Sequence, residues 1–239
     1  MKNLSFWLMG LVVLIAVSCG FKSEVQPLTE DLELFTEQNE DSKEVLMGVR
    51  DSETKDVVIF PGTYLSISAD KYTIVCKDKD STIVVYTTWG DKLGEFDTFN
   101  HWEVDGDYYL GTSYGNWCFY FPKQTKIIST KAIYQGLEYL FVERNGTWEI
   151  CDYYGEFISN IPYGCILIKE LKPDKSAEEY YYIEEIGEGA KTVYTLYDIQ
   201  NVKIKSYTAK QWKLVSKKLN PVQDVDGLTI VSAERVTKL

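Results

Sequence analysis

The chain has 239 residues, a formal net charge of −11 at pH 7 and an aromatic content of 14%. A chain of this length forms one domain or two small ones and can bury a substantial core. Its acidic balance excludes nucleic acid and anionic lipid headgroups as partners, because both require a basic surface.

The first residues form a short apolar leader. Residues 4–17 are apolar except for Ser5 and Gly10. This run is shorter than the roughly 20 apolar residues that a membrane-spanning helix needs. It therefore predicts a secretory signal peptide over residues 1–18.

A cysteine closes the leader, in the sequence Ala16-Val17-Ser18-Cys19-Gly20. This stretch resembles the lipobox of bacterial lipoproteins, although the motif more often has leucine where Ala16 stands. The resemblance implies lipid transfer to the Cys19 sulfur, cleavage after Ser18 and acylation of the new amine. Two or three acyl chains, palmitate among them, would hold the protein to a membrane. By analogy with the enterobacterial sorting rule, Gly20 favours the outer membrane. The alternative is an ordinary secretory signal with an incidental cysteine.

Residues 19–44 are polar and acidic, and they predict a flexible, self-repelling tether. One stretch within them, residues 29–38, could instead form a short helix, with Thr29 as its N-cap and with Leu32 and Phe35 on one face.

From residue 45 the pattern changes to short alternating segments rich in aromatic and β-branched residues, which predict strands. Asn145-Gly146 is the strongest hairpin signal, because a type I′ turn needs positive φ at both central residues. The predicted strands cover residues 45–50, 57–60, 64–67, 72–77, 82–87, 108–112, 117–121, 126–128, 139–143, 148–151, 164–169, 180–184, 192–197 and 202–207.

The hairpins repeat. Aligning them on Tyr72, Tyr109, Tyr139 and Tyr181 places an aromatic residue at the start of each, at an imperfect period typical of stacked or radially arranged β units. Residues 51–67 with 72–75, and residues 142–158, resemble the WG-type repeat: strand, Asp/Gly turn, short strand and a further strand. Glu149 replaces the glycine that follows tryptophan in that family. The resemblance implies a binding or scaffold role and carries no catalytic residue.

Residues 45–207 are therefore expected to form an all-β domain of antiparallel hairpin repeats, arranged as a stack, propeller, barrel or sandwich. The C-terminal region, residues 208–239, differs. Thr208 is a candidate N-cap, Trp212 and Val215 share one face, and Asn220-Pro221 ends the pattern. It predicts a capping helix followed by a closing hairpin across Asp226-Gly227.

No catalytic set is evident. The single histidine, His101, is expected in a surface loop, and no cofactor or metal site is predicted. Paired carboxylates two residues apart leave a weak calcium site open. A glycoside hydrolase also remains an alternative, because its two carboxylates meet only in space. The candidate carboxylates are Asp97, Glu103, Asp105, Asp107, Glu149 and Asp152.

The aromatics divide into core and exposed groups. Trp117 and Trp148 occupy equivalent strand positions and are expected in the core, whereas Trp89 and Trp102 lie at loop ends and are the candidate ligand-binding pair. The cysteines of the β region permit two disulfides or four buried thiols: Cys76, Cys118, Cys151 and Cys165.

The sequence thus favours a lipid-anchored, non-catalytic binding or scaffold module of the cell envelope, with protein or envelope partners. Surface glycan capture by exposed Trp and Tyr side chains is the second hypothesis, and an envelope glycoside hydrolase is the third.

Overall fold

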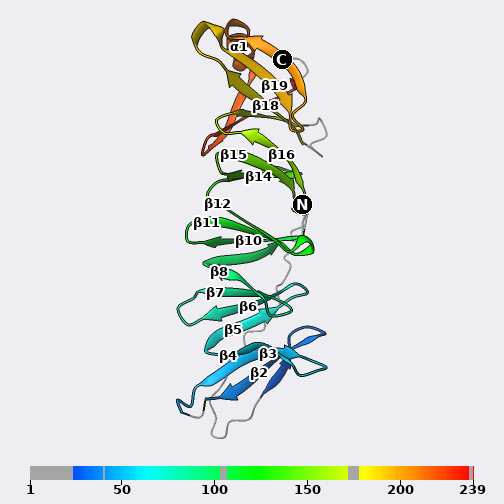
Figure 1. The fold of residues 1–239 in the computed structure, drawn as a ribbon, viewed down its shortest axis with the longest axis vertical. Helices are drawn as coiled ribbons and strands as arrows, with labels where there is room; N and C mark the ends of the chain where they lie inside the picture. The colour runs from blue at the N-terminus through cyan, green and yellow to red at the C-terminus, as the bar shows by residue number, and fades with distance from the viewer. Residues whose placement is uncertain (1–23, 40, 103–106, 172–177, 237–238) are drawn as a thin grey trace, which may run out of the picture. The chain divides into compact units, whose positions relative to one another are not determined.

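The computed structural model describes residues 24–39, 41–102, 107–171, 178–236 and 239. It divides into two compact units, residues 1–99 and 100–239. The described strands form five sheets, and four of these are four-stranded (Figure 1). Within the sheets, most strands that follow one another in the chain pair antiparallel, so the hairpin is the repeated element.

The first unit contains two of the four-stranded sheets. One consists of β1 (Val25–Pro27), β2 (Leu32–Gln38), β3 (Val45–Asp51) and β4 (Val57–Gly62). The other consists of β5 (Tyr64–Ala69), β6 (Thr73–Asp78), β7 (Ile83–Thr87) and β8 (Lys92–Phe96). A single buried cluster takes Leu34 and Val49 from the first sheet and Ile74 and Val84 from the second, so the two sheets share one core.

The third sheet begins at the boundary between the units and the fourth follows it. The third consists of β9 (Thr98–Trp102), β10 (Tyr108–Ser113), β11 (Asn116–Phe121) and β12 (Lys126–Thr130), with the short 3-10 helix η1 (Pro122–Gln124) before β12. The fourth consists of β13 (Ile133–Gln135), β14 (Tyr139–Arg144), β15 (Thr147–Asp152) and β16 (Phe157–Pro162). Phe119 and Phe121 of the third sheet pack with Leu140 and Val142 of the fourth.

The fifth sheet has six strands. Its antiparallel part is β17 (Ile166–Leu171), β18 (Glu178–Ile186), β19 (Val193–Asp198) and β20 (Lys203–Thr208), with η2 (Gly189–Lys191) before β19. The chain then forms α1 (Ala209–Val215), η3 (Ser216–Lys218), β21 (Asn220–Val225) and β22 (Leu228–Ala233). Strand β22 pairs parallel with β17, which the sequence did not predict.

The C-terminal helix is the predicted one. Thr208 caps it through a capping box with Gln211, in which each side chain receives the backbone N–H of the other. Trp212 and Val215 lie on its buried face and pack against Ile183 and Leu196 of the last sheet. The expected all-β fold of antiparallel hairpin repeats with a C-terminal capping helix is confirmed.

The tyrosines on which the hairpins were aligned mark equivalent strands in four of the sheets. Tyr109, Tyr139 and Tyr181 lie in β10, β14 and β18, and Tyr72 directly precedes β6. Each of these strands is the second in its meander. The repeat that the sequence indicates is therefore a structural repeat of the fold.

The prediction of a flexible tether over residues 19–44 is wrong for residues 25–38, and so is the alternative of a helix over residues 29–38. Strand β2 pairs with both β1 and β3. Leu32 and Leu34 are buried on one face of β2, and Glu33 between them pairs with Arg50 and Lys55. The acidic residues that indicated repulsion are in part neutralised by the next hairpin. Residues 1–18 and Cys19 lie outside the described part of the chain.

Candidate functional site

Trp89 is the most exposed of the tryptophans in the described part of the chain, with 82% of its surface accessible. It lies in the turn between β7 and β8, where the Gly90 N–H donates to the Thr87 carbonyl at 3.0 Å. Gly90 has a φ of +95°, and a Cβ there would lie 2.7 Å from the Val58 carbonyl oxygen. Only glycine fits this close approach to β4. The turn is therefore fixed against the sheet and holds the indole at the surface.

A pocket with a volume of 570 Å³ opens beside Trp89. Leu32 and Val58 supply apolar walls, and Trp89 supplies an aromatic wall. The pocket lies within the first unit and takes residues from the β1–β2, β3–β4, β5–β6 and β7–β8 connections. Its size is within the usual range for small-ligand sites.

The pocket is acidic. Lys71 is the one cation among its lining residues, and the carboxylates are Glu30, Asp31, Asp51, Asp56 and Asp70. Two of them are occupied by local turns. Asp51 Oδ1 accepts the N–H groups of Thr54 at 2.7 Å and of Glu53 at 2.8 Å, and Asp70 Oδ1 accepts two backbone N–H groups of its own turn.

The backbone donors of Thr54 and Glu53 hold the pKa of Asp51 below its ordinary value. The other three carboxylates differ. Within the described residues, the side chains of Glu30, Asp31 and Asp56 make no hydrogen bond or ion pair. They remain available to a ligand.

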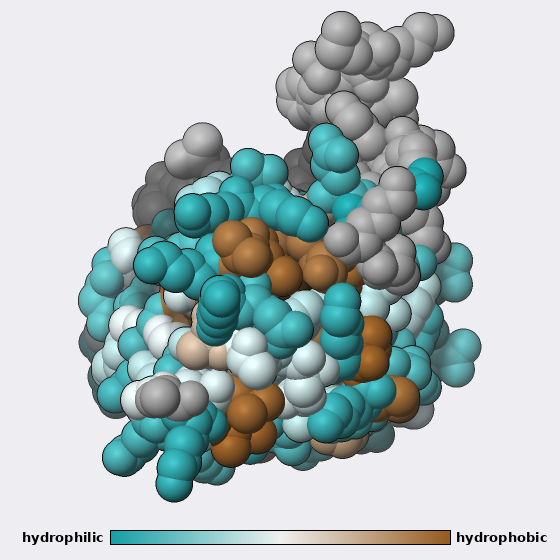
Figure 2. All heavy atoms as spheres, turned by 90° about the horizontal axis from the view of Figure 1, so that it is seen from above, coloured by the Kyte–Doolittle hydropathy of each residue, from teal (hydrophilic) through white to brown (hydrophobic). Residues whose placement is uncertain are grey.

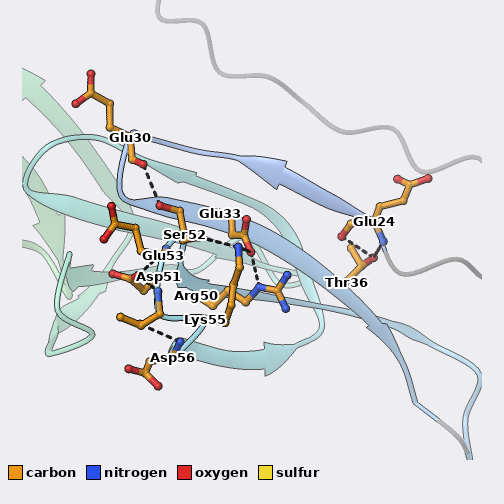
Figure 3. Close-up of polar contacts among 11 residues, drawn as sticks. Glu24, Glu30, Glu33, Thr36, Arg50, Asp51, Ser52, Glu53, Lys55 and Asp56 are labelled. Atoms are coloured by element: carbon orange, nitrogen blue, oxygen red, sulfur yellow. Dashed lines mark hydrogen bonds and ion pairs between the residues drawn. The ribbon is translucent and has the colours of Figure 1, made fainter.

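The bases next to the pocket are already paired (Figure 3). Arg50 Nε lies 2.6 Å and Lys55 Nζ 2.9 Å from the same Glu33 oxygen. Hydrogen bonds from Lys55 and Arg50 lower the pKa of Glu33, so it stays ionised. Lys55 also donates to the Ser52 carbonyl at 2.7 Å, and Ser52 Oγ donates to the Glu30 carbonyl at 3.0 Å. These contacts hold the two loops together and leave Glu30, Asp31 and Asp56 without an ion pair to Arg50 or Lys55.

Trp102, the other predicted ligand-binding residue, lies on β9 with 48% of its surface exposed. It belongs to the second unit, whereas Trp89 belongs to the first. The structure therefore describes two exposed aromatics, one in each unit. Trp148 is fully buried, as predicted, but Trp117 is 38% exposed and its prediction as core is wrong.

Other apolar side chains are exposed as well, among them Phe60, Tyr114 and Leu214. Figure 2 shows a mostly hydrophilic face on which hydrophobic patches are separated by hydrophilic residues. Isolated exposed apolar residues are normal on the surface of folded domains.

His101 is not a loop residue, which corrects the prediction. It lies on β9, its Nε2 is 3.0 Å from Asp107 Oδ1, and its ring stacks on Tyr109 with centroids 4.2 Å apart. Asp107 also lies 3.8 Å from Lys123 Nζ. These contacts fix the imidazole between a carboxylate and an aromatic ring.

The remaining carboxylates considered for hydrolysis are engaged locally or exposed. Glu149 pairs with Arg144 at 3.1 Å, and Asp152 accepts the N–H groups of Tyr154 and Glu156, each at 2.9 Å. Asp97 is exposed in the first unit, and Glu103 and Asp105 lie outside the described residues. Among the described residues no group of three or more His, Cys, Asp or Glu side chains could hold a metal ion.

The four cysteines of the β region are free and buried. The structure thus selects the buried-thiol alternative over two disulfides. Burial raises the pKa of Cys76, Cys151 and Cys165 to about 12, which makes these thiols unreactive near neutral pH.

None of the described helices has the length and hydropathy needed to cross a bilayer. No protein-family model matches the sequence, and no curated protein matches it.

Two solved structures are similar in part. One, titled as the eukaryotic initiation factor, is 8% identical with a TM-score of 0.29 over 79% of this chain and 54% of its own. The other, BamB from Moraxella catarrhalis, is 12% identical with a TM-score of 0.23 over 76% of this chain and 62% of its own. The chain spans less than two thirds of either structure, and likenesses this weak carry no functional argument.

Proposed function

We propose that this protein is a non-catalytic binding module of the cell envelope, lipid-anchored through Cys19, most consistently at the outer membrane. The observation that carries the binding role is the pocket of the first unit, where an indole that is 82% exposed stands beside unpaired carboxylates. The lipobox-like leader supports the anchor and the location. Each buried methylene contributes about 0.8 kcal/mol to membrane binding, so two or three acyl chains give stable attachment.

The lining chemistry favours a basic segment of an envelope protein as the partner. Glu30, Asp31 and Asp56 attract cations, and the face of Trp89 binds an ammonium or guanidinium group by cation–π attraction. The apolar walls of Leu32 and Val58 suit the methylene stems of lysine or arginine. Complementary charge of this kind accelerates encounter and selects the partner.

Binding of an arginine-containing peptide probe to the protein tests the role of the pocket. Trp89→Ala and the double variant Asp31→Asn, Asp56→Asn are each expected to weaken binding about tenfold, which corresponds to about 1.4 kcal/mol. Binding should also weaken with added salt. Asp97→Asn is the matched control, because it removes an exposed carboxylate of the same unit that does not line the pocket. An equal loss in Asp97→Asn, or no loss in Trp89→Ala, contradicts the proposal.

The anchor has its own test. Cells grown with labelled palmitate should label the wild-type protein and leave Cys19→Ala unlabelled. Absence of label from both proteins rejects the lipoprotein assignment and leaves the binding role untouched.

Glycan capture is the second candidate function, supported by the exposure of Trp89 and Trp102. Each would act as a stacking platform for a sugar ring. Affinity gels containing polysaccharides should retain the wild type and release the double variant Trp89→Ala, Trp102→Ala. Failure of the wild type to be retained on any gel removes this candidate.

A further inference from the structure

The second unit contains a cavity that the sequence did not predict. It has a volume of 560 Å³ and takes its walls from β11, the β12–β13 connection, β13 and the β21–β22 hairpin. These segments lie far apart in the chain, so only the folded unit brings them together. The cavity does not include Trp89 or Trp102.

Trp117 forms its aromatic wall. Side chains alternate along a strand, so Trp117, Phe119 and Phe121 project from the same face of β11. Phe119 and Phe121 are fully buried against the next sheet, whereas Trp117 is 38% exposed. Along this face of β11, Phe119 and Phe121 are therefore buried in the core, and Trp117 lies at the end that borders the cavity.

The corresponding position in the next sheet shows that this exposure is specific to the cavity. Trp148 is the second residue of β15, as Trp117 is of β11, and each follows a tight turn that ends in glycine. Trp148 is fully buried. Trp148 gains stability from burying its whole indole, and Trp117 gains less because part of its indole stays in water. Such partial exposure is expected where a bound ligand covers the rest of the ring.

The opposite walls are polar and electrically balanced. Gln135 comes from β13 and Gln223 from β21, and Lys131 and Asp226 contribute one charge of each sign. Asp226 accepts the Tyr163 hydroxyl at 3.3 Å. In the described part of the chain, Gln223 and Lys131 have no side-chain partner, whereas Gln135 Nε2 donates a long hydrogen bond of 3.5 Å to the Tyr108 hydroxyl and keeps its amide oxygen unpaired. The walls therefore offer amide donors and acceptors without a net charge, in a protein that is strongly acidic as a whole.

We propose that this cavity binds a neutral saccharide. A pyranose ring presents one face of C–H groups, which packs on the indole of Trp117, and a rim of hydroxyl groups, which the amides of Gln135 and Gln223 can both donate to and accept from. The balanced charges give no preference for an anionic or a cationic ligand. The volume suits one or two sugar rings. This site requires neither Cys19 nor the Trp89 pocket, so it stands independently of the proposed function.

Indole N–H resonances of the ¹⁵N-labelled protein provide a direct test. The probes are cellobiose, maltose and N,N′-diacetylchitobiose, each titrated to millimolar concentration. At least one disaccharide is expected to shift the Trp117 resonance with a saturating curve and to leave the Trp148 resonance unchanged. No shift of Trp117 with any of the three overturns the proposal.

Variants separate the cavity from the other aromatics. Trp117→Ala should weaken binding at least tenfold, measured by calorimetry with the disaccharide that binds. Gln223→Ala alters an exposed side chain on an edge strand, keeps the fold, and should weaken binding several-fold. Phe157→Ala is the matched control, because it removes an exposed aromatic side chain of the same unit outside the cavity. Unchanged affinity in both Gln223→Ala and Trp117→Ala rejects the site, and so does an equal loss of affinity in Phe157→Ala.

Discussion

The buried ion pair between Lys169 of β17 and Glu178 of β18 is expected to dominate the pH dependence of the second unit. The Glu178 side chain is 3% exposed and that of Lys169 is 25% exposed. Lys169 contacts one oxygen of Glu178, and the Tyr180 hydroxyl and the Leu137 N–H donate to the other, the latter at 3.1 Å. Removing one member of such a pair leaves a buried charge uncompensated and costs about 3–5 kcal/mol.

The pKa values give the direction of the pH effect. Burial alone would raise the pKa of Glu178, but hydrogen bonds from Lys169, Tyr180 and Leu137 outweigh it and hold the pKa below the ordinary value of 4.5. A carboxyl group with a lowered folded-state pKa stabilises the protein fully above its unfolded pKa. That contribution is lost as the pH falls from about 4.5 through the folded value.

The pKa of Lys169 shifts in the opposite direction to that of Glu178. Burial alone would lower its pKa, yet the bond to Glu178 raises it above 10.5. Its contribution is present below that pH and is lost as the pH rises through the folded value. The pair therefore supports the fold across the whole neutral range.

Lys169→Met should lower the free energy of urea unfolding by about 3–5 kcal/mol at pH 7. The double variant Lys169→Met, Glu178→Gln should recover part of this loss, because it leaves no buried charge. Hydrogen exchange at the Leu137 amide gives a local readout, since this N–H donates to Glu178. Its protection should decrease in Glu178→Ala and persist in Glu185→Gln, an exposed carboxylate on the same strand. Two results together would refute the reasoning. One is a loss of unfolding free energy below about 1 kcal/mol in Lys169→Met, and the other is an unchanged fall of stability at acidic pH in Glu178→Gln.

Trp148→Ala should lower the free energy of unfolding by about 3–5 kcal/mol, because it empties a fully buried site; a loss below about 1 kcal/mol in urea unfolding contradicts this packing. Thr208→Ala should cost about 1 kcal/mol by removing the N-cap of α1, whereas Thr208→Ser should restore most of it. Gly155→Ala should reduce the thermal midpoint, because the Cβ would lie 2.6 Å from the Phe121 ring at a φ of +84°; an unchanged midpoint argues against this contact. Iodoacetamide should leave Cys151 unmodified at pH 8 until urea is added, because burial raises its pKa to about 12, and rapid labelling of the folded protein would contradict its burial.

Local signals in the sequence predicted the interior strands and several of their turns. Asn145 and Gly146 have φ values of +54° and +77°, as the type I′ hairpin between β14 and β15 requires. Every predicted strand overlaps an observed one, and these include the edge strands β4, β5, β12 and β20.

The missed strands are mainly those at sheet edges: β1, β8, β9, β13 and β16. An edge strand is short or polar because one side faces solvent, and its alternation is correspondingly weak. In β8, for example, Lys92 pairs with Glu95 at 2.6 Å, which a sequence shows only as two charges. Strand β2 is the exception, since it is interior, and the acidic residues around it concealed its apolar alternation.

The candidate sites depend on contacts that spacing does not reveal. Exposure of Trp89 followed from its place in a Gly-containing turn, but the carboxylates around it come from other loops. Trp117 was misassigned because its strand position matches that of Trp148. Whether such a position is buried depends on how far the neighbouring sheet extends over it, which no local pattern encodes.

The C-terminal segment serves the last sheet in two ways. Helix α1 covers its face through Trp212 and Val215, while β22 pairs with β17 and so occupies an edge that would otherwise be open. Strand β21 is then the outermost strand of the sheet, and its Pro221 has no backbone N–H to donate. The same β21–β22 hairpin supplies Gln223 to the saccharide cavity. Protection of the sheet edge and completion of the cavity therefore depend on one element, so a substitution that detaches this hairpin should reduce stability and saccharide affinity together.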